Sequence, residues 1–450
     1  MKLVIIGVGK VGETLLENFV KEQHDIIVVD TNQDKVRYIV DHYDVQGIVG
    51  SGLDKDTLLD AETNTADFVI TCTSRDEMNI LCCVLARKLG AKSTIARVRD
   101  PEFFNGFENV REDLGVDFFF NPELRAADEI RSVLKFPSAK NVESFAGGKA
   151  RMVEFDILKG NPLVGKNLMQ IGKEYGNKVL FGLVMRNGDA LIPRGDFILK
   201  DGDAVNIIGD ETEIVNFTKK IKMFKPKSKT VFIIGGGKLA YYLSKKLIND
   251  GVSVKIVEKD GDRATELSKE LPAATILHLD ATEQELLEEA NLKNCDACVT
   301  LTGIDEENVI LSLYAKESGV SKVITKITRP TLFGMAKTLG LDTVISPRNA
   351  IANHIVQFVR ANQAVTGNGI NTLYKLSGKV EALEFSVGED FTALGKPIKQ
   401  MQIDKRILIG GIVRDGQFVL PSGDTMFERG DKVIVVSSIK HLKELTQIIR

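Results

Sequence analysis

The chain has 450 residues, 43% of them apolar, and its 59 basic and 62 acidic residues give a net charge of −3. This balance excludes a general nucleic-acid binder, which would be strongly basic, and no apolar run approaches the ~18 residues of a membrane span. The N-terminus lacks a signal-peptide pattern, and five cysteines are too few for a disulfide framework in a chain of this length. We therefore expect a cytoplasmic protein with no transmembrane segment of its own.

Residues 1–136 alternate short Val/Ile-rich runs with amphipathic stretches. Apolar runs of this length between helical patterns are typical of a parallel sheet covered on both faces. We therefore predict a doubly wound, Rossmann-like α/β domain. Its predicted strands are 3–7, 25–30, 45–50, 67–73, 93–98 and 116–120, and its predicted helices are 11–23, 35–43, 56–62 and 78–90.

The pattern changes after residue 136. Residues 137–150 lose their periodicity and are predicted to be a linker. Residues 148–220 then alternate strands and turns, which predicts a small α+β domain with strands at 152–158, 179–188, 189–193 and 204–209. A basic segment, 219–229, follows. It is either a solvated linker or a contact with anionic lipid.

The second half of the chain repeats the first. The segment KLVIIGVGKVG at 2–12 matches KTVFIIGGGKLA at 229–240, and four further segments match in the same order. Such order indicates a tandem duplication rather than chance likeness. We therefore predict a second Rossmann-like domain at 229–361 and a second small α+β domain at 377–450.

The first domain carries a dinucleotide-binding fingerprint. Its six residues, placed between a predicted strand and a predicted helix, are Gly7, Val8, Gly9, Lys10, Val11 and Gly12. The glycines permit a tight turn, a close approach to pyrophosphate and helix packing, and the helix N-terminus attracts phosphate. Asp30 ends the next strand, where an acid bonds ribose hydroxyls, so an unphosphorylated ribose is favoured and we predict NAD(H) or adenosine nucleotides rather than NADP.

The second domain carries a weaker version of this fingerprint. Gly235, Gly237, Lys238 and Leu239 lead into Ala240, which replaces the third glycine, and Glu258 supplies the acid. The alternative is a retired pocket that no longer binds a ligand.

Residues at other strand ends complete the two candidate sites, because open α/β sheets bind ligands at the carboxyl ends of their strands. Thr73 and Thr302 follow the fourth strands and either contact the ligand or cap the next helices. After the fifth strands, Arg97 and Arg99 in the first half, and Lys326 and Arg329 in the second, either bind a terminal phosphate or form surface ion pairs.

Catalytic groups are missing from these patterns. The five histidines are scattered, Cys295 and Cys298 fit a small apolar core role, and there is no nucleophile elbow, paired-carboxylate motif or zinc-ligand spacing. We therefore expect no catalytic residues and no metal site. Two classes of function remain: a nucleotide-gated regulatory protein, which the duplication favours, and an NAD-dependent oxidoreductase whose catalytic group is unidentified.

These residues resemble those of a known family. The fingerprint with Asp30, the run from Thr73 to Asn79, the IARVR segment at 95–99 and the corners at Pro122 and Pro347 are similar to the cytosolic regulatory subunit of Trk-type potassium uptake systems. The resemblance covers essentially the whole chain. It implies that NAD(H) and ATP or ADP occupy the pockets, and that Arg97 and Arg99 approach phosphates.

The resemblance also implies partners and adenine contacts. Four chains would form a homotetrameric ring on the inner face of the cell membrane, beneath a channel-like potassium transporter subunit. The family often has a Gly-Asp-Ala-Thr run on the adenine side. Asp280 lies in the matching run of the second half, whereas the first half departs from the pattern and offers Ser51.

Overall fold

The computed structural model describes residues 1–341, 343–362, 369–376 and 379–449. The first domain is built on a six-stranded parallel sheet, as the apolar runs predict, and its strand order is β3-β2-β1-β4-β5-β6. Its strands are β1 (Lys2–Ile6), β2 (Asp25–Asp30), β3 (Gln46–Val49), β4 (Phe68–Thr71), β5 (Ser93–Arg97) and β6 (Phe118–Phe120). Its helices are α1 (Lys10–Lys21), α2 (Gln33–His42), α3 (Lys55–Asp60), α4 (Asp76–Leu89), α5 (Pro101–Phe107) and α6 (Pro122–Lys135).

The first C-terminal domain is a five-stranded sheet in the order β10-β9-β11-β8-β7, flanked by two helices. Its elements are β7 (Asn141–Phe145), β8 (Ala150–Ile157), α7 (Leu168–Tyr175), β9 (Leu180–Arg186), β10 (Asp189–Leu191), β11 (Asp203–Gly209) and α8 (Glu211–Lys220). The prediction of a linker at 137–150 is wrong in part, because β7 lies within it and pairs with β8 along the edge of this sheet.

The second half repeats the parallel sheet in the order β14-β13-β12-β15-β16-β17. Its strands are β12 (Thr230–Ile234), β13 (Ser253–Glu258), β14 (Thr275–His278), β15 (Ala297–Thr300), β16 (Lys322–Lys326) and β17 (Val344–Ile345). Its helices are α9 (Lys238–Asn249), α10 (Gly261–Glu270), α11 (Gln284–Glu289), α12 (Asp305–Glu317), α13 (Thr331–Thr338) and α14 (Pro347–Ala361).

The second C-terminal domain keeps the sheet and replaces the helices. Its strands, in the order β18-β19-β22-β20-β21, are β18 (Ile370–Lys375), β19 (Glu381–Ser386), β20 (Ile407–Arg414), β21 (Gln417–Val419) and β22 (Lys432–Ser437). Within 379–449 the only helical turns are short 3-10 segments, Ile398–Gln400 and Leu445–Ile448. Of the range predicted for this domain, residues 377, 378 and 450 lie outside the described residues.

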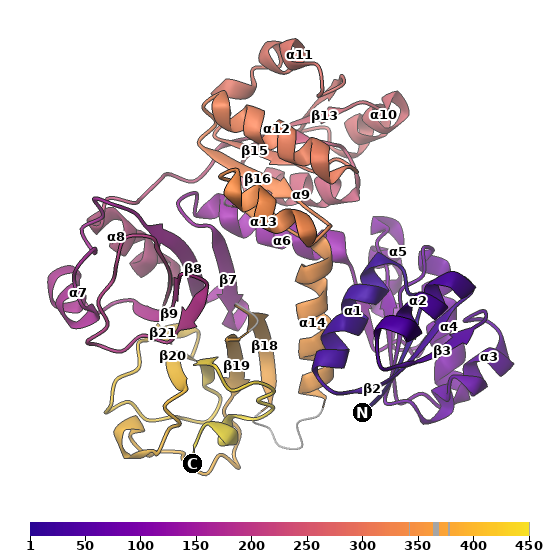
Figure 1. Cartoon of the computed structure of the whole chain (residues 1–450), viewed down its shortest axis with the longest axis horizontal. Coiled ribbons are helices and arrows are strands. Elements are labelled where there is room, and N and C mark those ends of the chain that lie inside the picture. Colours follow the sequence, from indigo (N-terminus) through magenta and orange to yellow (C-terminus); the bar gives the residue numbers. More distant parts are fainter. Residues whose placement is uncertain (342, 363–368, 377–378, 450) are drawn as a thin grey trace.

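The two halves are joined by an exchange of helices (Figure 1). Helix α6 leaves the first domain and packs on α9 of the second, whereas α14 leaves the second domain and packs on α1 of the first. The apolar faces that meet include Ile130 with Leu243 and Leu16 with Ile355, each in one continuous core. The C-terminal sheets also pack together, through residues such as Leu183 and Val413. The two nucleotide-binding folds are thereby held in one body.

Ion pairs fasten both exchanged helices. Asp250 at the end of α9 pairs with Arg131 of α6, and Glu22 at the end of α1 pairs with Arg360 of α14. None of the helices in the described ranges has the length and apolar character needed to cross a membrane.

Candidate functional site: two nucleotide pockets

The glycine-rich loop of the first domain requires glycine at two positions. Gly7 has a φ of +93°, and a Cβ there would lie 2.8 Å from the Thr73 backbone nitrogen. A Cβ on Gly12 would lie 2.1 Å from the Gly7 carbonyl oxygen. Gly9 is the N-cap of α1, so the unpaired N–H groups of this helix begin at the loop. The N-terminus of α1, with its unpaired N–H groups, therefore lies at the carboxyl edge of the sheet.

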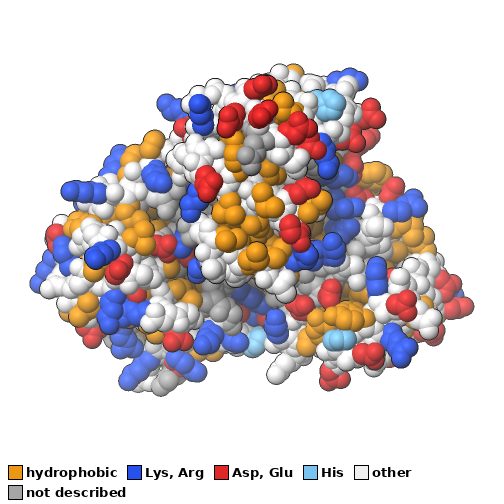
Figure 2. Space-filling view, turned by 45° about the horizontal axis from the view of Figure 1, so that its top comes forward, with side chains coloured by type: hydrophobic (Ala, Val, Ile, Leu, Met, Phe, Trp, Pro, Cys, Tyr) orange, Lys and Arg blue, Asp and Glu red, His pale blue; other side chains and the backbone are white. Residues whose placement is uncertain are grey.

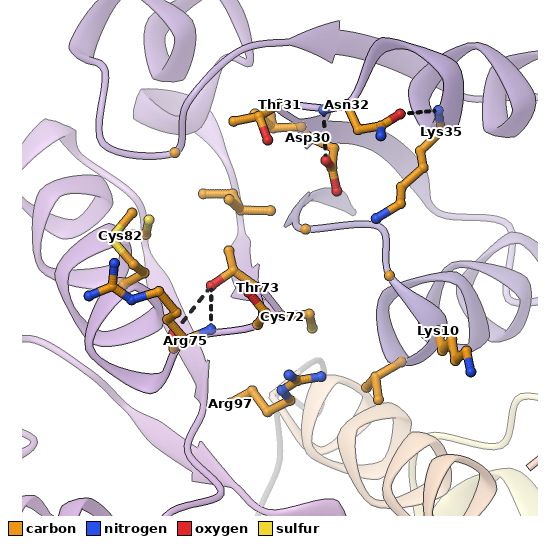
Figure 3. Close-up of a pocket in the computed structure, with 18 of the residues that line it drawn as sticks. Lys10, Asp30, Thr31, Asn32, Lys35, Cys72, Thr73, Arg75, Cys82 and Arg97 are labelled. Carbon is orange, nitrogen blue, oxygen red and sulfur yellow. Dashed lines mark hydrogen bonds between the residues drawn. The ribbon is translucent and has the colours of Figure 1, made fainter. Parts of the chain in front are cut away.

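Asp30 lies directly beside this loop (Figure 3). Its carboxylate accepts hydrogen bonds from the Val8 and Asn32 backbone N–H groups, both at 2.9 Å. These bonds fix the side chain in place. A carboxylate has about four acceptor positions, so Asp30 retains capacity to accept from a pair of ribose hydroxyls.

Hydrogen bonds of a buried asparagine fix the conformation of the loop after β4. Asn79 accepts from the Thr73 backbone N–H at 2.7 Å and donates to the Arg97 carbonyl at 2.9 Å. The Thr73 hydroxyl donates to the Arg75 carbonyl. The capping alternative for Thr73 and Thr302 is wrong, because the N-caps of α4 and α12 are Arg75 and Ile304 and neither helix has a side-chain cap.

A cavity of about 750 Å³ opens at this edge of the first sheet. The structure brings most of the predicted residues of the first half together along its wall. Those lining it are Gly7, Gly9, Lys10, Val11, Asp30, Ser51, Thr73, Arg97 and Arg99. Val8 and Gly12 do not line the cavity but shape the loop, through the bond from Val8 to Asp30 and the close packing at Gly12.

The cavity is rich in buried positive charge. Arg97 is only 8% exposed, burial lowers the pKa of its guanidinium, and its Nε has no hydrogen-bond partner among the described residues. Arg99 Nε also lacks a hydrogen-bond partner among the described residues, but it lies 3.8 Å from Asp76 and the guanidinium donates to the Ser74 carbonyl at 2.7 Å. A buried guanidinium with unmade hydrogen bonds is costly unless an anion joins it.

The second half of the chain contributes to this same cavity. Lys326 and Arg348 line it, and burial lowers the pKa of both side chains. Glu123, at the start of α6, is the carboxylate that opposes them, and its Oε2 is buried without a partner. Figure 2 shows Lys and Arg side chains gathered at the junction of the two nucleotide-binding domains. The first pocket is therefore completed by residues from both halves.

The second pocket is smaller, with a volume of about 210 Å³. Gly235 has a φ of +98°, as Gly7 does, and Glu258 accepts from the Gly236 and Asp260 N–H groups at 2.6 and 2.8 Å. Asp280 accepts from the Thr282 N–H at 2.9 Å. Of the residues predicted for this site, those lining the cavity are Gly235, Glu258, Asp280 and Thr302.

Four predicted residues of the second half do not line its cavity. Gly237 and Leu239 belong to the loop and α9, and Lys238 forms an ion pair with Asp100 of the first domain at 2.8 Å. Arg329 pairs with Asp305 at 3.5 Å and with Glu306. The ion-pair alternative therefore holds for Arg329, and the lysine of the second loop is already engaged.

The cavities hold no nucleophile poised for catalysis. Cys72 and Cys82 line the first cavity, but burial raises the pKa of their thiols to about 12 and about 11. Such thiols stay protonated and unreactive at neutral pH. No histidine lines either cavity, and the described residues contain no cluster of metal-ligating side chains.

Sequence reasoning missed some lining residues. Lys35 and Asn32 follow Asp30 and could have been found from their place after the strand (Figure 3). Lys326 was not missed but was predicted for the second half, from its place at the end of β16, whereas it lines the first cavity. Arg348 carried no such signal, because it reaches the first pocket only through the contact between the halves.

Parallel sheets with glycine-rich loops and acidic strand ends define a tandem nucleotide-binding protein, and comparisons with known proteins give the family. The TrkA-N domain family matches residues 3–122 and 231–347, and the TrkA-C domain family matches 152–222 and 382–450. A relative from Methanosarcina mazei, the Trk system potassium uptake protein TrkA homolog 2, is 31% identical over 100% of both chains. The chain belongs to the TrkA family of Trk system potassium uptake proteins.

Two solved structures share the fold. One, described as the GsuK channel bound to NAD, has a TM-score of 0.64 at 17% identity, covering 98% of this chain and 77% of that one. The other, GsuK bound to ADP, has a TM-score of 0.52 at 14% identity, covering 80% and 69%. The family assignment favours the regulatory interpretation over the oxidoreductase alternative.

Proposed function

We propose that this chain is the cytosolic regulatory subunit of a Trk-type potassium uptake system and that it senses NAD(H) and ATP or ADP, chiefly in its first pocket. One observation carries the proposal: the first pocket combines a glycine-rich loop and a strand-end acid, Asp30, with cations from both halves of the chain. The relatives' names supply the transport system, and the GsuK structures with NAD and ADP support the ligand class.

The ligand would lie along the carboxyl edge of the first sheet. Its ribose hydroxyls would bond to Asp30 and its pyrophosphate would face the α1 N-terminus. The adenine would lie toward Ser51, which lines the same cavity. Further phosphates would extend toward Arg97, whose buried guanidinium lacks a partner at Nε and can bind an anion bidentately.

Nucleotides of different length would then act differently on the two halves. A terminal phosphate long enough to reach Lys326 and Arg348 would join the second half to the first, whereas a shorter ligand would not. A ligand shifts a two-state equilibrium only by its differential affinity, and full switching needs roughly 5.5 kcal/mol. Over four chains this is roughly 1.4 kcal/mol each, a tenfold difference in affinity.

Assembly into a ring of four chains is supported by exposed apolar side chains at matching places. Leu81 on α4 and Ile310 on α12 are equivalent in the repeat, and both are more than half exposed, at 51% and 63%. Met335 and Leu339 lie on and just after the neighbouring α13 and are also exposed. Figure 2 shows an apolar patch on the forward face of the second nucleotide-binding domain. Apolar patches of this kind mark protein–protein contacts.

The membrane partner would be a channel-like potassium transporter subunit, with this chain held at the inner face of the cell membrane. The test is reconstitution of both subunits in vesicles, with rubidium uptake measured while ATP, ADP or NADH is exchanged. We expect uptake to differ at least threefold between nucleotides and to become insensitive to them with Asp30→Ala. Uptake that ignores every nucleotide in the wild-type complex would contradict the proposal.

A further inference from the structure

A second large cavity, of about 500 Å³, lies away from both nucleotide pockets. It is found between the first C-terminal domain and the second nucleotide-binding domain, at the amino end of β16, whereas the glycine-rich loops face carboxyl ends of strands. Its walls are the segments that follow four helices. They are 137–140 after α6, 222–225 after α8, 320–323 after α12, and Gly340, Leu341 and Thr343 after α13. We call it the lysine cavity.

Five lysines and one carboxylate line the lysine cavity: Lys140, Lys222, Lys225, Lys316, Lys322 and Asp156. Three of the lysines have acceptors within the protein. Lys322, at 7% exposed, donates to the Ala139 carbonyl and, at 2.8 Å, to the Thr343 hydroxyl. Lys316 donates to the Gly340 carbonyl at 2.8 Å, and Lys140 pairs with Asp156. Carboxyl ends of helices attract such cations.

The other two lysines lie in the segment after α8 and have no such acceptor among the described residues. Lys222 and Lys225 are exposed at the cavity wall, in the segment that joins the two halves. Neither forms a side-chain hydrogen bond or ion pair with any residue in the described ranges. Their ammonium groups add to the field of the three bound lysines, and like charges in a partly enclosed space repel more strongly than in open water.

The same cavity offers an apolar surface. Met223, Val320 and Leu341 line it beside the lysines. A cavity of several hundred Å³ with apolar walls and a few charged groups is the usual form of a small-molecule site. Phosphate suits the lysines, because its oxygens accept from several ammonium groups at once.

We infer that the lysine cavity binds a phosphorylated small molecule, with its phosphates against Lys222 and Lys225 and its organic part against the apolar wall. This ligand would contact the first C-terminal domain, the joining segment and the second nucleotide-binding domain together. Its occupancy would therefore favour the arrangement of these three parts. The position of the cavity between two domains favours a soluble ligand over a lipid headgroup in a bilayer.

The test uses the full chain with inorganic pyrophosphate as the probe. Acetylation of each lysine is followed by peptide mass spectrometry across a pyrophosphate titration. We expect acetylation of Lys222 and Lys225 to slow at least fivefold, while the exposed Lys173 and Lys178 of the same domain react as before. The slowing should persist in Arg97→Met, which removes the cation of the first pocket.

Two double variants distinguish binding in the lysine cavity from attraction of pyrophosphate to positive charge elsewhere on the domain. Lys222→Ser/Lys225→Ser should weaken pyrophosphate protection of Lys316 at least tenfold, and the matched variant Lys173→Ser/Lys178→Ser should leave it unchanged. Equal protection of all four lysines, unaltered protection in the first double variant, or loss of protection in Arg97→Met would each overturn the inference. Protection by phosphatidylglycerol vesicles but not by pyrophosphate would also overturn it, in favour of a lipid surface.

Discussion

The two nucleotide-binding domains share a topology, a glycine-rich loop and an acid at the end of the second strand, but their pockets differ. The first cavity is more than three times the volume of the second, about 750 against about 210 Å³. Buried Arg97 remains unpaired at Nε in the first, whereas Lys238 of the second loop is paired with Asp100. The two copies therefore share one fold, but among the described residues a buried cation with an unpaired Nε lies only in the first of the two pockets.

The contrast extends to the ion pairs that fasten the exchanged helices. The Glu22–Arg360 pair is buried, with side chains 4% and 2% exposed. Arg360 also pairs with Glu381, and Glu22 accepts from His441 and Lys375. At the equivalent place, Asp250 is 22% exposed and pairs with Lys135, the counterpart of Arg360, at 3.4 Å and with Arg131, and these two side chains are 29% and 34% exposed. The same place in the repeat is therefore a buried network in one copy and a surface pair in the other.

The largest effect should come from breaking the buried network. Removing one partner of a buried ion pair costs about 3–5 kcal/mol, because the other charge is left uncompensated. We expect Glu22→Gln to lower the free energy of unfolding by about 3 kcal/mol, measured with denaturant. The matched Asp250→Asn should cost about 1 kcal/mol or less, as exposed pairs do. Equal costs for the two variants would contradict this difference.

The contribution of the same ion-pair network to stability should depend on pH in the acid range. Burial is the largest single influence and raises the pKa of Glu22, but the hydrogen bonds and charge of Arg360, together with Lys375 and His441, outweigh it and lower the pKa from 4.5 to about 2. Because the folded-state pKa is the lower one, the stabilisation is complete above pH 4.5 and is lost as the pH falls toward 2. The difference in stability between wild type and Glu22→Gln should shrink across this window. A constant difference would show that the carboxylate charge is not the cause.

The next effect concerns the two acids that we propose to bind ribose. Asp30→Ala should weaken NADH binding at least about 100-fold, because hydrogen bonds to a charged group contribute roughly 1.5–3 kcal/mol each. Glu258→Ala should change total NADH binding less than about threefold, since the second cavity is small. Calorimetric titration measures both. A larger loss in Glu258→Ala than in Asp30→Ala would reverse the assignment of the two pockets.

A smaller effect is expected at Arg97, where substitution should weaken ligand binding but stabilise the ligand-free chain. Arg97→Met should weaken ADP binding about 30-fold, since a charged contact to phosphate is lost. It should also stabilise the ligand-free chain by about 1 kcal/mol, because an incompletely paired buried charge is removed. Calorimetry and thermal unfolding measure the two. The control is Arg37→Met on α2, which is 81% exposed and does not line the cavity, and its ADP affinity should stay within threefold of wild type. An equal loss in Arg37→Met would contradict a specific role of Arg97.

The smallest effect is predicted at the second loop. Lys238 and Asp100 are 40% and 36% exposed, so their ion pair contributes little. Lys238→Ala should leave ADP affinity within about twofold and stability within about 0.5 kcal/mol. A tenfold loss of ADP affinity would mean that the second loop holds phosphate despite Asp100.

Much of the first domain and of its candidate site could be predicted from the sequence, because the signals lie within short segments of the chain. Strands β1 to β6, the turn at Gly7 and the position of Asp30 follow from apolar runs and from the spacing of the fingerprint. Strand β7 was missed because Asn141–Phe145 is short and is followed, after Ala146, by two glycines. The loss of α-helices from the second C-terminal domain was also not predicted.

Arg348 could not be placed from the sequence. It reaches the first pocket because the apolar face of α14 packs on α1, and that pairing depends on contacts between residues more than 300 positions apart. Arg329 was assigned to the second pocket, which it does not line, for a related reason. Its strand-end position was read correctly, but the sequence does not show that Asp305 and Glu306 lie within reach of its guanidinium.

The central claim is that one pocket of each chain is the nucleotide sensor. The most direct measurement is the stoichiometry of ADP bound to the full chain by equilibrium dialysis, over concentrations that saturate the tight phase. The account predicts one tightly bound ADP per chain, lost in Asp30→Ala and retained in Glu258→Ala. Two equivalent ADP molecules per chain, or one that survives Asp30→Ala, would contradict it.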